Sequence, residues 1–306
     1  IPVVVHVIQD TGGEGFLSAQ TIQDQIDVLR EDYLALPGSP GAPGRTARIS
    51  FHLAKLDPAD TSAGPGGKEV TRAAIEPLAA RLADLQEILW ARQNETVLVV
   101  LQGIDTSGKG GTVEHVFGAV NPAGLKVTSF KAPTEEELGH DFLWRVHRQV
   151  PGSGEMAIFN RSHYEDVLVA RVRKLVPKEV WKARYRQIVD FERLLAESGT
   201  TILKFFLHID RDEQKRRLEA RLADPQKRWK FRLADLEDRR LWDDYAAAYE
   251  DALGKTSQKH APWYVVPANK KWYRNLVVAK ILVQALEKLD LREPEPEEDL
   301  TGVTIE

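Results

Sequence analysis

The pattern of apolar and polar residues along the chain predicts strands that alternate with helices. A continuous apolar run, typical of a strand buried on both faces of a sheet, begins at residue 97 and belongs to a strand predicted at 97–102. Further strands are predicted at 126–130, 156–160, 201–209 and 263–267. Amphipathic or charged helical patterns lie at 75–92, 112–120, 134–147, 177–198, 210–253 and 271–289. This alternation predicts the α/β class, with one parallel sheet covered by helices on both faces.

The N-terminal stretch has a pattern of its own. Residues 1–8 are typical of a strand, 18–34 of an amphipathic helix, and PGSPGAPG at 37–44 of a non-helical linker. Together with residues 49–54, this opening resembles the first part of a pappalysin-type zinc metalloprotease domain. However, the chain contains no H-E-x-x-H motif, so it lacks the zinc-binding helix that such an enzyme needs.

These patterns divide the chain into three parts. We expect residues 1–54 to be an appended segment of unknown role and residues 55–290 to form the main domain. Residues 290–299 hold six acids against one base, which predicts a solvated acidic tail over 291–306.

Composition narrows the function classes. The 306 residues include no cysteine, which excludes disulfides, thiolate metal sites and cysteine nucleophiles. No apolar run approaches the roughly 20 residues needed to span a bilayer, and the start is not signal-like, so we expect a cytoplasmic enzyme without a membrane partner. A net charge of −4 argues against a nucleic-acid partner. Residues 145–186 hold ten Lys and Arg against four acids, which favours an anionic substrate there or, after residue 171, a salt-bridged helix face.

Residues 97–112, VLVVLQGIDTSGKGGT, place a Gly-rich turn between a strand and a helix. Gly103, Gly108 and Lys109 have the G-x-x-x-x-G-K spacing of a phosphate-binding loop. In such a loop the backbone N–H groups converge on phosphate oxygens, the helix N-terminus adds its positive dipole end, and the lysine adds an ammonium. We therefore predict a phosphate site here; the alternative is a tight turn without a ligand.

The residue after the lysine departs from the usual loop. Gly110 stands where a Ser or Thr normally holds Mg²⁺. Asp105 or Thr112 could bind the Mg²⁺ instead, and a hard cation favours the carboxylate of Asp105. Gly110, Gly111 and Thr112 are also predicted to bind phosphate.

A second polar group, IFNRSHYEDV at 158–167, follows a strand. In an open α/β sheet the carboxyl ends of the strands face the ligand crevice. Arg161 can fork onto phosphate oxygens, and Glu165 and Asp166 can hold Mg²⁺ directly or through water. The alternative is that these groups cap the following helix.

Residues 211–240 hold eleven Lys and Arg against seven acids, and Pro225 interrupts them. This pattern predicts two helices joined by a bend, as in a lid that closes over phosphates and excludes water. Its candidate phosphate-binding cations are Arg217, Arg221 and Lys230. Pairs at spacing i,i+4, such as Glu213 with Arg217, would instead make some of these charges structural.

Six motifs in order closely resemble the type 2 polyphosphate kinases: LQGIDTSGKGGT, FLWRVHRQVP, FNRSHYEDV, RYRQIVDFERLL, KRWKFRLADLEDRRLWDDY and APWYVVPANKKWYRN. The match runs from about residue 53 to 289. The resemblance implies a P-loop kinase fold related to thymidylate kinase. It also implies homo-oligomers, dimers or tetramers, and reversible Mg²⁺-dependent phosphoryl transfer from inorganic polyphosphate to a nucleotide.

The resemblance also assigns residues. It matches Asp105 and Lys109 to the loop aspartate and lysine of the family, Asn160 and Arg161 to its strand-end pair, and Arg217 and Arg221 to its lid. FNRSHYED resembles the branch that phosphorylates both AMP and ADP, with Glu165 at a position tied to that choice. That branch more often has aspartate at the position of Gly110.

These assignments give an expected mechanism. The loop amides and Lys109 hold the terminal phosphates of the donor, Asp105 holds Mg²⁺ with Asp166 as a second candidate, and lid arginines close the site. Arg161 orients the acceptor phosphate, which belongs to an adenine or a guanine nucleotide. Residues expected to track the rest of the polymer are Arg145, His147 and Arg148. The competing functions are an ATP-dependent nucleoside monophosphate kinase and a non-catalytic polyphosphate- or nucleotide-binding module.

Overall fold

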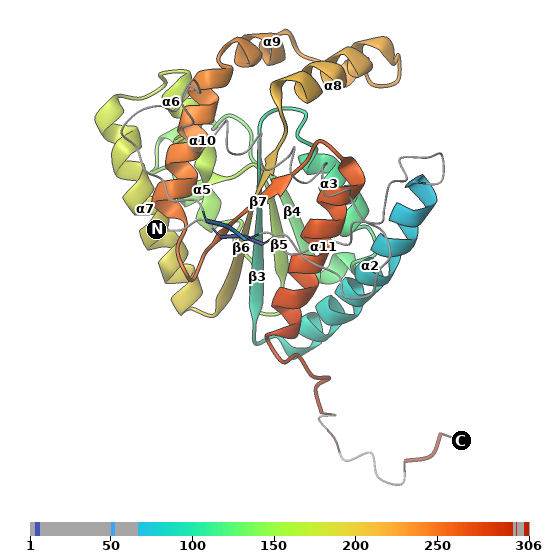
Figure 1. Cartoon of the computed structure of the whole chain (residues 1–306). Coiled ribbons are helices and arrows are strands. Elements are labelled where there is room, and N and C mark those ends of the chain that lie inside the picture. The colour runs from blue at the N-terminus through green and yellow to red at the C-terminus, as the bar shows by residue number, and fades with distance from the viewer. Residues whose placement is uncertain (1–3, 7–49, 53–66, 296–297, 299–302, 306) are drawn as a thin grey trace.

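The computed structural model describes residues 4–6, 50–52, 67–295, 298 and 303–305 (Figure 1). Strands β1 (Val4–His6) and β2 (Ser50–His52) pair in parallel, with Val5 opposite Phe51. The helix and the linker predicted at 18–34 and 37–44 lie outside the described residues. Among the described helices, none combines the length and the apolar composition that a membrane crossing requires.

The predicted parallel sheet is confirmed. Its five strands run in the order β4-β5-β3-β6-β7, and every pair is parallel. The strands are β3 (Thr96–Gln102), β4 (Leu125–Ser129), β5 (Met156–Asn160), β6 (Thr200–His208) and β7 (Trp263–Pro267). After β3 the chain forms the edge strand β4, returns to form β5 between β4 and β3, and then crosses to β6 and β7 on the other side of β3. This reversal beside β3 is where ligands bind in open α/β sheets.

Helices cover both faces of the sheet, as Figure 1 shows. One layer holds α2 (Gly67–Arg92), α3 (Lys109–Val116) and α11 (Lys271–Glu287). The other holds α5 (Trp144–His147), α6 (Val169–Val172), α7 (Lys178–Glu197) and α10 (Trp242–Thr256). Side chains of β3 alternate between the two cores: Val97 and Val99 pack toward α11, and Leu98 and Val100 pack toward α7. Strand β3 is therefore buried on both faces, as its continuous apolar run predicts.

Two predicted helices are broken in the structure. The single helix expected at 134–147 is instead α4 (Glu135–Leu138), capped by Thr134, and α5. Asp141 lies between these two helices. Its carboxylate accepts from the Leu143 N–H at 2.9 Å, which starts a new turn and ends the continuous helix that was expected. The charged stretch 210–253 forms α8 (Arg211–Ala223), a 3₁₀ turn (Arg228–Lys230), α9 (Leu233–Arg240) and α10, so the two predicted helices become three.

The remaining short elements are 3₁₀ turns at Pro122–Gly124 and His163–Asp166. The second follows β5 directly and carries the polar group predicted at the end of that strand. Figure 1 shows α8 and α9 at the edge of the sheet where the strands end, which is the position of a lid over the loop that follows β3.

Candidate functional site

The Gly-rich loop connects the end of β3 to the first turn of α3. Gly103 has a φ of 152°, and a Cβ there would lie 2.6 Å from the carbonyl oxygen of Leu207, so the sheet leaves room only for glycine. Gly108, the residue before α3, has a φ of 104°. No side chain caps this helix, so its first N–H groups are free for a ligand.

Lys109 lies across the loop and not out in solvent. Its Nζ donates to the carbonyl oxygens of Gly103 at 2.6 Å and of Ile104 at 3.4 Å. Burial, with the nearby Arg161 guanidinium, lowers the pKa of Lys109 to about 8, although Asp105 and Glu165 oppose the shift. The lysine is buried but has no carboxylate of its own within hydrogen-bond range among the described residues.

Arg161 joins the end of β5 to the loop. Its φ of 63° is unusual for a residue with a side chain, and its N–H donates to the Leu101 carbonyl at 3.1 Å. The guanidinium donates through Nη2 to Asp105 Oδ1, and through Nη1 to Glu165 Oε2 at 3.5 Å. The strained backbone thus aims the arginine back over the neighbouring strand end. The structure brings Asp105, Lys109, Arg161 and Glu165 into one cluster.

The pKa values of the two carboxyl groups of this cluster are shifted in opposite directions. Burial raises the pKa of Asp105, but Arg161, Lys109 and Arg221 outweigh it, so the pKa is lowered and the group is ionised at neutral pH. For Glu165 burial prevails over Arg161 and Lys109, and its pKa is raised. The cations that act on these two carboxyl groups at the loop are Lys109, Arg161 and Arg221.

Gln102 is a site residue that the sequence interpretation missed. It is fully buried at the end of β3. With its amide oriented to satisfy both neighbours, it donates to Glu165 Oε1 at 3.1 Å and accepts from the Ser162 N–H at 3.0 Å. A polar residue closing the apolar run VLVVLQ is the signal that could have found it.

The lid helix α8 touches the loop through Arg217. Its Nη1 donates to the Thr106 carbonyl at 2.7 Å, its Nη2 to the Ala268 carbonyl at 2.6 Å, and its Nε to Glu213 Oε1 at 2.7 Å. Every nitrogen of this guanidinium already has a protein acceptor. A direct phosphate contact, as predicted for Arg217, therefore has no support in this geometry, and the Glu213 pairing considered as its alternative is present.

The other lid cations lie farther along. Arg221 is near enough to influence Asp105 and Lys109, and its Nη1 lies 4.0 Å from Asp235 Oδ2. Lys230 sits on the 3₁₀ turn of the lid, with its Nζ 5.1 Å from the centre of the Trp229 ring.

Asp166, although next to Glu165, belongs to a different cluster. Its Oδ1 accepts from Arg184 at 3.1 Å, and its Oδ2 lies 3.7 Å from Arg145. Burial raises its pKa although both arginines oppose the shift. The predicted metal role of Asp166 is not supported by this geometry, because successive residues of the 3₁₀ turn point in different directions.

The residues predicted to track the polymer also lie in that second cluster or beside it. Arg145 is buried and donates to the Lys131 carbonyl at 2.8 Å. His147 and Arg148 are exposed at the end of α5, and the Arg148 guanidinium stacks 4.7 Å over the Trp144 ring. Of this predicted set, only these two present an open basic surface.

Three further residues predicted to bind phosphate or nucleotide are Asn160, Thr112 and Gly110. Asn160 ends β5, opposite Leu101. The Thr112 hydroxyl donates to the Gly108 carbonyl at 3.2 Å, so it is used within its own helix. A Cβ at Gly110 would meet nothing within 4 Å, which shows that this glycine faces open space.

Asp105 is the loop carboxylate that could hold a metal ion. In the described part of the chain no three His, Asp or Glu side chains gather as a metal cage. Mg²⁺ in phosphoryl-transfer sites is commonly held by one or two carboxylates together with substrate phosphates, and an ionised carboxylate on the loop supplies that kind of ligand.

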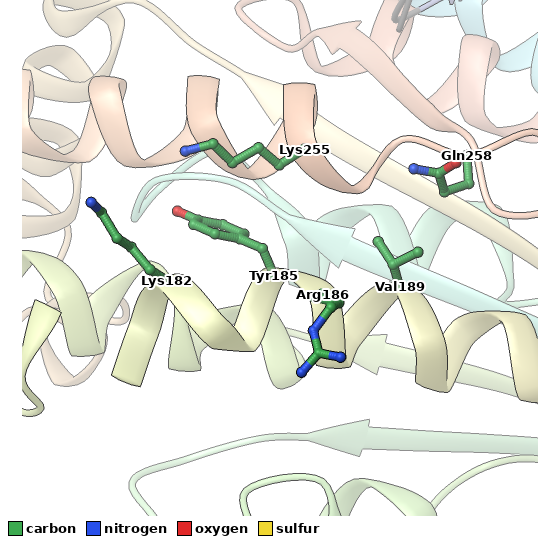
Figure 2. Close-up of a pocket in the computed structure, with 6 residues that line it drawn as sticks. All are labelled: Lys182, Tyr185, Arg186, Val189, Lys255 and Gln258. Atoms are coloured by element: carbon green, nitrogen blue, oxygen red, sulfur yellow. The ribbon is translucent and has the colours of Figure 1, made fainter. Parts of the chain in front are cut away.

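A shallow groove of about 490 Å³ lies away from the loop, between α7 and α10 (Figure 2). Its lining residues are Lys182, Tyr185, Arg186, Val189, Lys255 and Gln258. None of them belongs to the loop or to the Arg161 cluster. Lys255 is paired with Asp251 at 2.6 Å, so the groove belongs at least partly to a salt-bridged helix face.

Comparisons with known proteins agree with this geometry. Residues 66–294 match the protein family described as Polyphosphate kinase 2 (PPK2). The chain is 59% identical to an AMP/ADP-polyphosphate phosphotransferase of Meiothermus ruber, over 84% of this chain and 96% of that protein. It is 44% identical to an ADP-polyphosphate phosphotransferase of Rhodopseudomonas palustris, over 74% and 81%. The crystal structure of Polyphosphate Kinase 2 from Arthrobacter aurescens TC1 superposes with a TM-score of 0.75 at 49% identity, covering 82% of this chain and 90% of that one.

Proposed function

The chain belongs to the polyphosphate kinase 2 family, and we propose that it transfers the terminal phosphoryl group of inorganic polyphosphate to AMP and ADP. Its parallel sheet and loop are those of a P-loop kinase. The observation that carries the proposal is the cluster of Lys109, Asp105 and Arg161 at the adjoining ends of β3 and β5, in a chain 59% identical to a phosphotransferase of this kind.

The loop would hold the donor. The N–H groups at the start of α3, the Lys109 ammonium and the nearby Arg161 and Arg221 together form a positive site that suits condensed phosphates. The side-chain hydroxyls of Thr106 and Ser107 support this role, because both are buried and neither has a hydrogen-bond partner among the described residues. A phosphate oxygen would supply the missing acceptor.

Arg161 would orient the acceptor phosphate. Its side chain is 38% exposed beside the loop, so it can exchange part of its contact with Asp105 and Glu165 for a nucleotide phosphate. Asp105 would hold Mg²⁺, which neutralises charge on the phosphates when it is bound. Glu165, fixed by Gln102, would then limit which acceptor phosphate fits.

The lid would exclude water. Phosphoryl transfer needs positioning and charge neutralisation more than a strong nucleophile, and hydrolysis competes with it. Arg221 on α8 is a lid cation that influences both Asp105 and Lys109, and Lys230 lies in the flanking turn. We propose that Arg221 and Lys230 approach the phosphates, whereas Arg217 braces the loop.

The proposed function is tested by a coupled assay. The protein is incubated with Mg²⁺, long-chain polyphosphate and either AMP or ADP, without added triphosphate, and ATP is measured. We expect ADP to yield ATP and AMP to yield ADP; guanine nucleotides and the reverse reaction are assayed in parallel. If phosphorylation requires ATP as donor, the protein is instead a nucleoside monophosphate kinase. If it binds polyphosphate or nucleotide without turnover, it is a non-catalytic binding module.

Further parts of the proposal concern the whole protein. We propose that it acts in the cytoplasm. We also propose that it is a homo-oligomer, and light scattering of the purified protein would test this oligomeric state. Residues 1–54 are proposed to be dispensable, because the family match covers only residues 66–294. A protein lacking residues 1–54 should keep full activity in the coupled assay.

A further inference from the structure

Arg274, in the first turn of α11, lies directly behind the phosphate loop. Only 2% of the residue is exposed. Its Nη1 donates to the Ser107 carbonyl at 3.3 Å, and its Nε and Nη2 donate to Asn275 Oδ1 at 3.0 and 2.7 Å. The guanidinium is thus fixed at one end by its neighbour and at the other by the loop.

No described carboxylate pairs with Arg274. Its acceptors are a carbonyl and an amide oxygen, both uncharged, and burial together with the nearby Arg217 lowers its pKa to about 10. It nevertheless stays charged at neutral pH. A buried cation without an anion is unfavourable for folding, so the fold alone gives little reason for a guanidinium at this position.

The loop is shaped around this side chain. A Cβ at Gly108 would lie 1.7 Å from Arg274 Nη1, and a Cβ at Gly111 would lie 3.3 Å from Nη2. Two of the glycines therefore face the guanidinium, whereas Gly110 faces open space. The close approach of backbone to guanidinium is possible only because these positions lack side chains.

Two successive carbonyls of the loop are each held by an arginine. Arg217 binds the Thr106 carbonyl, and Arg274 binds the Ser107 carbonyl. A carbonyl held on the back of the loop cannot turn toward the front, where it would repel a phosphate. The N–H groups that follow are then left facing the donor site.

We propose that Arg274 is a positioning residue for phosphoryl transfer: it holds the phosphate loop from behind, and its unmatched charge is balanced by the bound donor phosphates. This inference rests on the proposed function. It places the effect of Arg274 on the donor side, because Arg161, which follows β5, is the group proposed for the acceptor.

The test compares R274A, R274K and wild-type protein with Mg²⁺, polyphosphate and ADP. We expect R274A to lose about 100-fold in kcat/KM for polyphosphate, with the KM for ADP within about threefold of wild type. R274K should recover part of the loss, because lysine keeps the charge but lacks the fork that reaches both acceptors. The matched control is R171K, since Arg171 is also partly buried but pairs with Asp251 on α10, and it should behave as wild type.

A second readout does not depend on turnover. Tripolyphosphate should raise the unfolding temperature of the wild-type protein, and this rise should be largely lost in R274A. A folded R274A with kcat/KM within about threefold of wild type would overturn the proposal, as would an equal rise in the KM for ADP. If R274A does not fold, R274K decides: about a tenfold loss confined to the polyphosphate side supports the proposal, and no loss refutes it. A wild-type protein that makes no ATP would refute the proposed function, while the tripolyphosphate shift would still test Arg274.

Discussion

Lys109 and Lys204 are both buried lysines, but their surroundings differ in kind. The Lys204 ammonium, on β6, donates to Glu192 Oε2 at 2.6 Å, to the Tyr164 hydroxyl at 2.8 Å and to the Thr256 carbonyl at 2.9 Å. Its charge and its three hydrogen bonds are satisfied within the protein. Among the described residues the Lys109 ammonium donates only to backbone carbonyls, and the nearby Arg161 and Arg221 add further positive charge.

This difference separates a structural cluster from a binding site. In the Lys204 cluster the anion is part of the fold, so nothing is left for a ligand. In the loop cluster, Asp105 and Glu165 face more cations than they can neutralise, and Glu165 has a raised pKa. A polyanion such as the end of a polyphosphate chain would complete this second cluster. The predictions below test that distinction.

The largest effect is expected on activity at Lys109. K109M should lower turnover about 1,000-fold, because it removes the cation proposed to hold the donor phosphates. Its free energy of unfolding at pH 7 should be unchanged or higher by up to about 3 kcal/mol, since folding lowers the pKa of Lys109 from 10.5 to about 8. Near-normal turnover, or a large loss of stability, would contradict the assignment.

The opposite result is expected at Lys204. K204M should lower the free energy of unfolding by about 3–5 kcal/mol, because it leaves Glu192 buried without a cation. Its folded fraction should keep activity within a few-fold of wild type. The double variant K204M/E192L should regain part of the stability, as chemical denaturation would show. A K204M protein that is stable but inactive would mean that this cluster is functional.

The third prediction concerns pH. Because the pKa of Lys109 is about 8 in the folded protein, kcat/KM for polyphosphate should decline as the pH rises through about 8. K109R should move this decline to higher pH. The unfolded chain keeps the lysine proton up to pH 10.5, so the stability of wild type relative to K109M should rise between about pH 8 and 10.5. An unchanged profile in K109R would show that another group titrates.

The smallest effect is expected at Arg217, which links the lid helix α8 to the phosphate loop. Arg216 and Arg217 both pair with Glu213, but only Arg217 reaches the loop carbonyl of Thr106. R217A should therefore lower kcat about 30-fold by misplacing the loop, and R216A should leave it unchanged. Steady-state kinetics of the two variants decide; equal effects would mean that the contact with Glu213 is what matters.

Much of the fold follows from the sequence. The five strands lie within one or two residues of their predicted limits. Strands β3, β5, β6 and β7 are buried along most of their length and therefore appear in the sequence as mainly apolar runs, whereas the edge strand β4 is only partly buried. The meeting of Asp105 with Arg161 also follows, since the ends of neighbouring parallel strands lie together. The order β4-β5-β3-β6-β7 was not predicted, because periodicity describes each element and not its neighbour.

What the sequence does not reveal is the direction of individual side chains. Asp166 and Glu165 are adjacent in the chain, but only Glu165 faces the loop, whereas Asp166 faces Arg184. Arg217 has the spacing of both a lid cation and a partner of Glu213, and only the structure shows its carbonyl acceptors. Arg274 is far from the loop in sequence, so nothing in the loop motif points to it.

Binding of tripolyphosphate tests the central claim most directly. Calorimetry at pH 7 with Mg²⁺ and without nucleotide would compare wild type, K109M and the control R216A. We expect wild type and R216A to bind equally, and K109M to bind at least about tenfold more weakly because the loop has lost its ammonium. Equal binding by K109M and wild type would show that the loop cluster does not hold the donor.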